Sequence, residues 1–474
     1  MLSNMCPMRL RASSLLLATS LGLAAAFWSP STEACGGCFP PQGEQQSVVT
    51  DHRMILSISK DKSTLYDQIR YQGSPASFGW VLPIAGTVEV GLSANVVFQA
   101  LDNQTQTQIV APPLNCPARP SSCNQGFANA SAPTAGGAED SKGGVTVLKQ
   151  EVVGPYETVQ LASTDPNALE NWLAQNGYVV ADDVKPVIAA YVTEKFNFLA
   201  LKLVPGKGVQ DMRPVRVTTT GAGAVLPLRM VAAGTGPTVG ITLWVVAEGR
   251  YEPQNFTSFY IKTDDLVWDW TAQKSNYVDL RTQKTTEGNG RAWETESSLG
   301  VYKANIQQTV QYGTYSGSGP YPQTDEERAQ QDYLPVKDEQ GNIITTAAQV
   351  RDADMAALFA GAPGDQARVT RLRADLAHAA LDQDLSMTAS SDQALLSNVR
   401  QLTRELNEPQ CPVYNGCTQE GTAPRSEAIA RSSSDGNESF ACSTTPRSNP
   451  TWYAVGLGGL GIVLVNAMRR RRKG

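Results

Sequence analysis

The stretch Phe196-Asn197-Phe198-Leu199-Ala200-Leu201-Lys202-Leu203-Val204 decides the predicted fold class. Its leucines alternate with Ala200 and Lys202, which is the pattern of a β-strand that is covered mainly on one face. Other segments rich in Val, Ile, Phe, Tyr and Thr, each bounded by Gly, Pro or Asp, also predict strands. They are residues 53–59, 65–71, 78–82, 145–153, 158–162, 215–219, 225–230, 239–247 and 256–262. Antiparallel sheet is therefore expected to dominate.

Helices are expected at three places between these strands. Ser93 is in position to cap the first, Asp165-Pro166 to begin a second that Gly177 ends, and Asp183 to cap the third. Their apolar faces are Val97, Phe98 and Leu101, then Leu169, Trp172 and Leu173, and finally Ile188, Tyr191 and Val192. Because helices interrupt the strands, the predicted fold class is α+β, a predominantly antiparallel β-sheet ectodomain with inserted helices.

Two hydrophobic segments enclose the chain. Arg9 and Arg11 precede an apolar stretch that ends in Thr32-Glu33-Ala34, the pattern of a secretory signal peptide cleaved just before Cys35. Residues 452–468 are long enough for a transmembrane helix, and the cations at 469–473 are expected to stay on the cytoplasmic side. The protein is therefore expected to be exported and anchored in the cell envelope by its C-terminus, with its main domain outside the inner membrane.

Shifts in composition predict the domain boundaries. Residues 1–34 are the signal peptide, 35–262 a β-rich α+β domain with a flexible insertion at 112–144, and 263–420 a mixed, increasingly helical region. Helical spacing in that region is clearest in Leu395, Leu396, Val399, Leu402 and Leu406. Residues 421–451, low in apolar side chains, predict a disordered stalk before the transmembrane helix at 452–468 and a basic cytoplasmic tail at 469–474.

Six cysteines fall in close couples, Cys35/Cys38, Cys116/Cys123 and Cys411/Cys417. Disulfides persist in the oxidising compartments that an exported chain enters. Pairing within each couple is the simplest connectivity, although spacing does not choose among the possible ones. Cys442 is left over near the anchor, where it is the candidate for processing or lipid attachment.

The segment Asp264-Asp265-Leu266-Val267-Trp268-Asp269-Trp270 places acids among aromatic rings. Paired carboxylates beside a stacking surface can bind or cleave a sugar. Asp264, Asp265, Trp268, Asp269 and Trp270 are therefore the candidate ligand-binding residues. Tryptophans that alternate along a strand are more often half-buried core, and this alternative stays open.

Strong motifs for other chemistry are absent from the sequence. His52 and His378 are far apart, which excludes a histidine-rich zinc site, and no metal or cofactor is expected. Cys35-Gly36-Gly37-Cys38 has redox-dithiol spacing, but Phe39-Pro40-Pro41 follows it, which favours a structural disulfide. The net charge of -6, with its dense basic cluster only beside the anchor, argues against nucleic acid as a partner.

Two sets of short motifs resemble a bacterial family known only as a domain of unknown function, whose members are secreted and often membrane-anchored. The first set is Ala34-Cys35-Gly36-Gly37-Cys38-Phe39 and Phe78-Gly79-Trp80-Val81-Leu82-Pro83. The second is Trp172-Leu173, Asn176-Gly177-Tyr178, Pro227-Leu228-Arg229-Met230 and Val369-Thr370-Arg371-Leu372-Arg373. The resemblance covers roughly residues 35–384 and implies no reaction.

The C-terminus resembles the sorting tails of myxobacterial-type surface proteins, in which a cysteine precedes a short hydrophobic helix and an arginine cluster. Cys442, residues 452–468 and residues 469–472 supply these three parts. Together, these features predict a membrane-tethered cell-envelope protein that is a non-catalytic binding or structural module. Its expected partners are the membrane, through the helix or a lipid, and an envelope glycan or protein. The alternative is an envelope glycan or peptide hydrolase that uses the acids at 264–269.

Overall fold

The computed structural model describes residues 48–49, 52–68, 71–72, 79–119, 149–162, 166–180, 182, 184–232, 236–313, 322, 324–338, 340–415 and 417–435. These residues form two compact units. The larger unit contains the described residues up to 114 and those from 149 to 409, and the smaller contains 115–119 and those from 410 onward. The boundary predicted between residues 262 and 263 therefore lies inside the larger unit.

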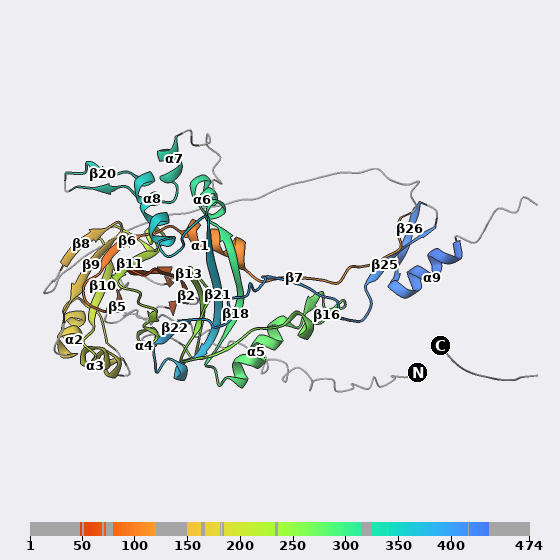
Figure 1. Ribbon diagram of the computed structural model, residues 1–474, viewed down its shortest axis with the longest axis horizontal. Helices are drawn as coiled ribbons and strands as arrows, with labels where there is room; N and C mark the ends of the chain where they lie inside the picture. The colour runs from red at the N-terminus through yellow and green to blue at the C-terminus, as the bar shows by residue number, and fades with distance from the viewer. Residues whose placement is uncertain are drawn as a thin grey trace, which may run out of the picture. The chain divides into compact units, whose positions relative to one another are not determined.

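An eight-stranded sheet is the centre of the larger unit. Its strands, in order across the sheet, are β15 (Thr257–Phe259), β18 (Ala292–Tyr302), β21 (Gln366–Ala377), β13 (Thr238–Ala247), β2 (His52–Ile58), β3 (Lys62–Gln68), β11 (Val215–Thr220) and β6 (Glu89–Leu92). All neighbours are antiparallel except β13 with β2 and β15 with β18. The long strands β18 and β21 run side by side in Figure 1. The predicted α+β class with mostly antiparallel sheet is confirmed.

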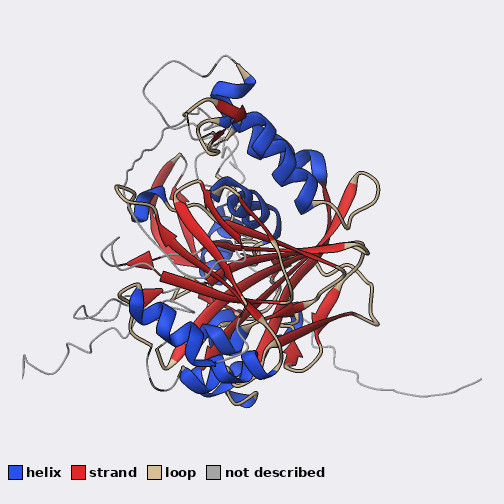
Figure 2. Cartoon of the chain, turned by 90° about the vertical axis from the view of Figure 1, so that its left-hand side faces the viewer, coloured by secondary structure: helices blue, strands red, loops and turns tan. Residues whose placement is uncertain are grey.

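Both faces of this sheet carry an apolar core, because side chains alternate along the strands. Trp244 and Val246 of β13 pack on one face with helices α1 (Asn95–Thr105), α6 (Lys303–Tyr312) and α8 (Ala347–Leu358). Leu243 and Val245 pack on the other face with α4 (Leu228–Val231) and β22 (Leu385–Ala389). Figure 2 shows helices above and below the strands of this unit.

The strand predicted at 196–204 is β10 (Asn197–Leu203) in a second, four-stranded sheet. The order is β5 (Gly79–Ile84), β10, β9 (Tyr156–Leu161) and β8 (Lys149–Val153), all antiparallel. Its leucines face one core cluster, whereas Phe198 and Ala200 face another that includes helices α2 (Pro166–Gln175) and α3 (Lys185–Thr193). The expectation of one covered face was wrong. Lys202 is compatible with burial because its Nζ lies 3.4 Å from Glu157 Oε2.

Shorter elements complete the larger unit. The helices are α5 (Tyr277–Glu287) and α7 (Asp325–Ala329). The strands are β1 (Val48–Val49), β4 (Tyr71–Gln72), β7 (Gln108–Val110), β12 (Val225–Leu226), β14 (Tyr251–Pro253), β16 (Trp268–Asp269), β17 (Lys274–Ser275), β19 (Val336–Lys337), β20 (Ile343–Thr345), β23 (Val399–Gln401) and β24 (Glu405–Leu406).

Three local predictions differ from the structure. The strand expected at 225–230 ends at Leu226, and α4 follows Pro227. The N-cap position of helix α1 is Ala94, which makes no side-chain cap, whereas Ser93 donates its hydroxyl to Asp354. Where a helix was expected around 395–406, the structure has β23 and β24, which pair with β7 and β16; Leu402 is buried, whereas Leu395, Val399 and Leu406 are exposed. Within 346–406, the described α-helix is α8.

The smaller unit contains a hairpin of β25 (Gln410–Asn415) and β26 (Thr418–Pro424), followed by α9 (Arg425–Asp435). Ala428 of α9 packs with Cys411, Val413 and Ala423, which gives the polar segment a small core. The disordered stalk was therefore wrong for 421–435. The predicted signal peptide, the rest of the stalk, the anchor, the basic tail and residues 120–144 of the insertion lie outside the described residues. Among the helices that the structure describes, none has the length and apolar composition needed to span a membrane.

Candidate functional site

The acids and tryptophans predicted as a ligand site lie in short neighbouring elements. Asp264 and Asp265 are exposed in a 3-10 turn, η4 (Thr263–Asp265), whereas Trp268 and Trp270 lie in and just after β16. The two indole rings meet edge to face, with centroids 5.9 Å apart. Trp270 Nε1 donates to Glu405 Oε2 at 2.7 Å, and Trp270 is 9% exposed. These contacts support packing as the role of the tryptophans.

Asp269 holds a turn. Its Oδ1 accepts hydrogen bonds from the backbone N–H groups of Thr271 and Ala272, at 2.7 and 3.1 Å, and from Asn407 Nδ2. These hydrogen bonds, the one from Ala272 foremost, lower the pKa of the carboxyl below its ordinary value. A general acid for glycoside cleavage needs a raised pKa instead. Asp269 is therefore suited to organising the loop rather than to donating a proton.

A buried pair of acids, which the sequence did not indicate, lies on β18. Glu294 is 1% exposed and Glu296 is 4% exposed. Tyr277 of α5 places its hydroxyl 2.9 Å from Glu294 Oε1 and 3.4 Å from Glu296 Oε1. The pairing of β18 with β21 shifts register between Thr295 and Ser297, and such a bulge redirects side chains. Strand alternation read from the sequence cannot reveal this change of direction.

The two acids differ in their partners. Glu296 Oε2 accepts from Arg371 Nε, whereas Glu294 Oε2 is buried and has no hydrogen-bond partner among the described residues. Burial, and next the charge of Glu296, raise the pKa of Glu294 to about 7. Glu294 therefore keeps its proton up to about neutral pH.

A layer of charge continues from this pair across the sheet. Arg371 of β21 also contacts Asp102 of α1, and Asp102 Oδ2 lies 2.6 Å from Arg53 of β2. Both guanidinium groups lie 5.0 Å from the centroid of the Trp244 ring. Paired charges and cation–π contacts of this kind offset the free-energy cost of burying two arginines. With Glu296, the layer joins α1 to four strands of the sheet, β18, β21, β13 and β2.

A second buried charge centre surrounds Asp354 of α8. Its carboxylate accepts hydrogen bonds from Ser93 Oγ at 2.6 Å, Tyr333 Oη at 3.0 Å and Arg216 at 3.2 Å. Burial raises the pKa of Asp354, against the opposing effect of these partners. This acid links α8 to β11, to the start of α1 and to the segment after α7.

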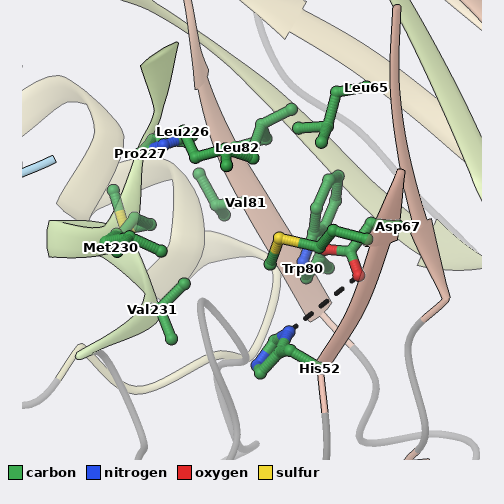
Figure 3. A pocket seen from close by; sticks show the side chains of 12 residues that line it. His52, Leu65, Asp67, Trp80, Val81, Leu82, Leu226, Pro227, Met230 and Val231 are labelled. Carbon is green, nitrogen blue, oxygen red and sulfur yellow. Dashed lines mark ion pairs between the residues drawn. The ribbon is translucent and has the colours of Figure 1, made fainter. Parts of the chain in front are cut away.

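A small cavity lies beside His52 and Asp67 (Figure 3). His52 Nδ1 is 3.9 Å from Asp67 Oδ1, and both side chains are buried. The other lining residues are apolar, namely Met54, Leu65, Trp80, Val81, Leu82, Leu226, Pro227, Leu228, Met230 and Val231. In Figure 3, Met230 and Val231 lie across the cavity from Asp67. The sequence could identify His52 but not its neighbour on the next strand.

The cysteine couples do not all pair internally. Cys116 forms a disulfide with Cys411, 295 residues further along the chain, and Cys417 is also disulfide-bonded. Pairing within the couples Cys116/Cys123 and Cys411/Cys417 was therefore wrong, because the fold returns residues 410–417 to the segment that follows residue 114. Cys35, Cys38, Cys123 and Cys442 lie outside the described residues.

Comparison with known proteins gives one informative match. The family described as "Uncharacterized protein conserved in bacteria (DUF2330)" matches residues 29–387. No curated protein matches the chain. Among solved structures, a mutated baculovirus P35 after caspase cleavage is similar at 9% identity and a TM-score of 0.23, over 75% of this chain and 100% of that one. The resemblance to a bacterial family of unknown function is thus confirmed, and the chain belongs to the DUF2330 family.

Proposed function

We propose that this protein is an exported cell-envelope protein, tethered to the membrane through its C-terminal segment, that serves there as a non-catalytic binding or structural module. The Cys116–Cys411 disulfide carries the proposal. Disulfides form and persist in oxidising compartments outside the cytoplasm. The disulfide-bonded state of Cys417 points the same way.

The smaller unit depends on such an environment. Its described apolar core contains Cys411, Val413, Ala423 and Ala428, with Cys116 packed against it. A hairpin and one helix bury too little apolar surface to be stable alone, so small units commonly use disulfides. This unit therefore needs oxidation in order to fold.

The acids of the larger unit support a non-catalytic role. Asp269 holds a turn, Asp354 holds three hydrogen-bond donors, and Glu296 pairs with Arg371. Each of these three carboxylates is engaged in contacts within the chain. An envelope glycan or protein is the class of ligand that we propose for the module.

Protease accessibility tests the location. In spheroplasts of the producing bacterium, added protease should digest the full chain. In intact cells, added protease should cut the chain only if the chain reaches the cell surface. Alkylation without reduction should leave Cys116, Cys411 and Cys417 unlabelled. A variant lacking residues 1–34 is the control and should stay protected and reduced. Full protection of the complete chain in spheroplasts, with free thiols at these cysteines, would contradict the proposal.

Incubation with purified envelope glycan separates the module from the hydrolase alternative. The full chain should bind the glycan and be recovered with it in a pull-down, without releasing soluble sugar or peptide. Release of product that is lost in Asp264→Ala or Asp269→Ala would instead favour the hydrolase.

A further inference from the structure

Three side chains with metal-binding atoms are neighbours on one face of the β2–β3 pair. His52 and Met54 are two residues apart on β2, so they point to the same side of the sheet. Asp67 on β3 is the direct cross-strand partner of Met54. Residues opposed in this way have Cβ atoms about 5 Å apart. All three line the same cavity, which brings an imidazole, a thioether and a carboxylate to one wall.

The size of the cavity limits what it can hold. Its volume of ≈ 20 Å³ is room for a single ion or water molecule. Organic ligands need pockets of several hundred Å³, on the order of 300 or more. Trp80, Leu65 and Leu82 cover the three donors with apolar surface. The site therefore suits one ion beside mostly apolar side chains.

The distance between His52 and Asp67 leaves space for a bridging atom. The 3.9 Å from Nδ1 to Oδ1 is too long for a direct hydrogen bond. Two bonds from a metal ion to nitrogen and oxygen, each about 2.0–2.2 Å, together span up to about 4.4 Å. Asp67 Oδ1 is buried and accepts no hydrogen bond from the described residues, a state that costs free energy unless something binds there.

The donors and the charge select the ion. Asp67 is the one carboxylate among the described lining residues, so a monovalent cation gives a neutral site, whereas a divalent one leaves an unbalanced buried charge. A thioether with an imidazole favours Cu(I) over harder ions. No three His, Cys, Asp or Glu side chains are grouped to hold a metal among the described residues, so a site here needs the Met54 thioether as its third donor. We propose that His52, Met54 and Asp67 form a binding site for one Cu(I) ion.

Competition for Cu(I) tests the site. The purified full chain, without oxygen, is titrated with Cu(I) against a chromophoric Cu(I) chelator. One ion should bind per chain, and His52→Gln, Met54→Leu and Asp67→Asn should each weaken binding by about 10- to 100-fold. Met387→Leu removes a buried methionine outside the cavity, and His378→Ala removes the exposed histidine; both should bind as the wild type does. Thermal melting of each variant confirms that it folds.

X-ray absorption at the copper edge identifies the ligands. The wild-type spectrum should contain one sulfur neighbour, which Met54→Leu should lose while nitrogen and oxygen neighbours remain. Failure of the wild-type chain to retain Cu(I) would overturn the proposal and leave a hydrated or direct His52–Asp67 ion pair. Equal affinity in the wild type and all three cavity variants would place the ion outside this cavity and would overturn the proposal equally.

Discussion

Glu294 is an acid whose ionisation depends on its neighbours in the fold. An unperturbed glutamate has a pKa of 4.5, whereas burial and the nearby Glu296 raise that of Glu294 to about 7. Around it, α5 contributes Tyr277 and Arg281, β21 contributes Arg371 and Arg373, and Arg400 follows on β23. None of these is near Glu294 in the sequence except Tyr277 and Arg281.

The free energy of unfolding should depend on pH through the ionisation of Glu294. The pKa of Glu294 is higher in the folded than in the unfolded protein. Proton binding by Glu294 therefore stabilises the fold fully below about pH 4.5, and this stabilisation is lost as pH rises through about 7. The free energy of unfolding should fall by roughly 3 kcal/mol across this window. Urea unfolding of Glu294→Gln from pH 5 to 8 should lack this decrease. Glu287→Gln, an exposed change on α5, should retain it. If the free energy of unfolding fell equally with pH in Glu294→Gln and in the wild type, the decrease would belong to another group.

Asp354 of α8 is a buried carboxylate that accepts hydrogen bonds from three other segments of the larger unit. Asp354→Ala should lower the free energy of unfolding by about 3–5 kcal/mol, because it leaves Arg216, Ser93 and Tyr333 without their shared buried acceptor. Asp352→Ala, two residues earlier on α8, removes a mostly exposed carboxylate and should change stability by less than about 1 kcal/mol. Chemical denaturation measures both. Similar losses of unfolding free energy in the two variants would show that α8 is sensitive to any substitution, and that the Asp354 contacts are not the cause.

At the scale of elements, the end of α8 is attached to β2. Ser57 Oγ donates to the carbonyls of Ala357 and Leu358, at 3.0 and 2.9 Å, so a strand side chain satisfies the last turn of the helix. Gly361 follows at once and lies against the backbone of β2. A Cβ added there would be 1.6 Å from the Ile58 carbonyl oxygen.

Gly361→Ala should therefore force the α8–β21 connection away from β2. We expect a loss of about 3 kcal/mol or more in unfolding free energy, at the upper end of the usual cost of overpacking. Gly223→Ala is the matched control, because its added Cβ meets Ser63 Oγ at 3.2 Å, a side-chain atom that can rotate. Differential scanning calorimetry compares the two. A small effect at Gly361 would mean that this connection moves freely.

At the scale of the whole molecule, the chain builds two units from segments that are far apart in sequence. The central sheet joins residues 52–68 with 366–377 through β13. The smaller unit joins residues 115–119 with 410–435. Its disulfide closes a sequence separation of 295 residues, a constraint on the unfolded chain worth on the order of 5 kcal/mol.

Cys411→Ser should unfold the smaller unit and leave the larger one folded. Because the described core of the smaller unit includes both cysteines, its loss should expose residues 410–435 to protease. Limited trypsin digestion followed by mass spectrometry should show cuts at Arg425 and Arg431 in the variant, with β13 and β21 intact. Met387→Leu, a buried change in the larger unit, should leave these two sites protected. Protection of both arginines in Cys411→Ser would show that the unit folds without the bond.

The sequence by itself determined the elements whose signals are local. Alternating leucines predicted β10, and segments rich in Val, Ile, Phe, Tyr and Thr between turn residues predicted β2 and β13. An Asp-Pro start with a Gly end predicted α2, since spacing and capping act within a few residues. Family membership followed from short motifs in order.

Only the tertiary structure decided which distant side chains meet. The contacts of Glu296 with Arg371, of His52 with Asp67, and of Cys116 with Cys411 depend on a bulge, on strand register and on the return of the chain. Apolar residues at 395–406 have helical spacing, yet this segment contains the short strands β23 and β24, which pair with β7 and β16, and Leu395, Leu396 and Leu402 lie outside these strands. Local spacing carries no information about such partners, since their free energy of contact exists only once the sheet has formed.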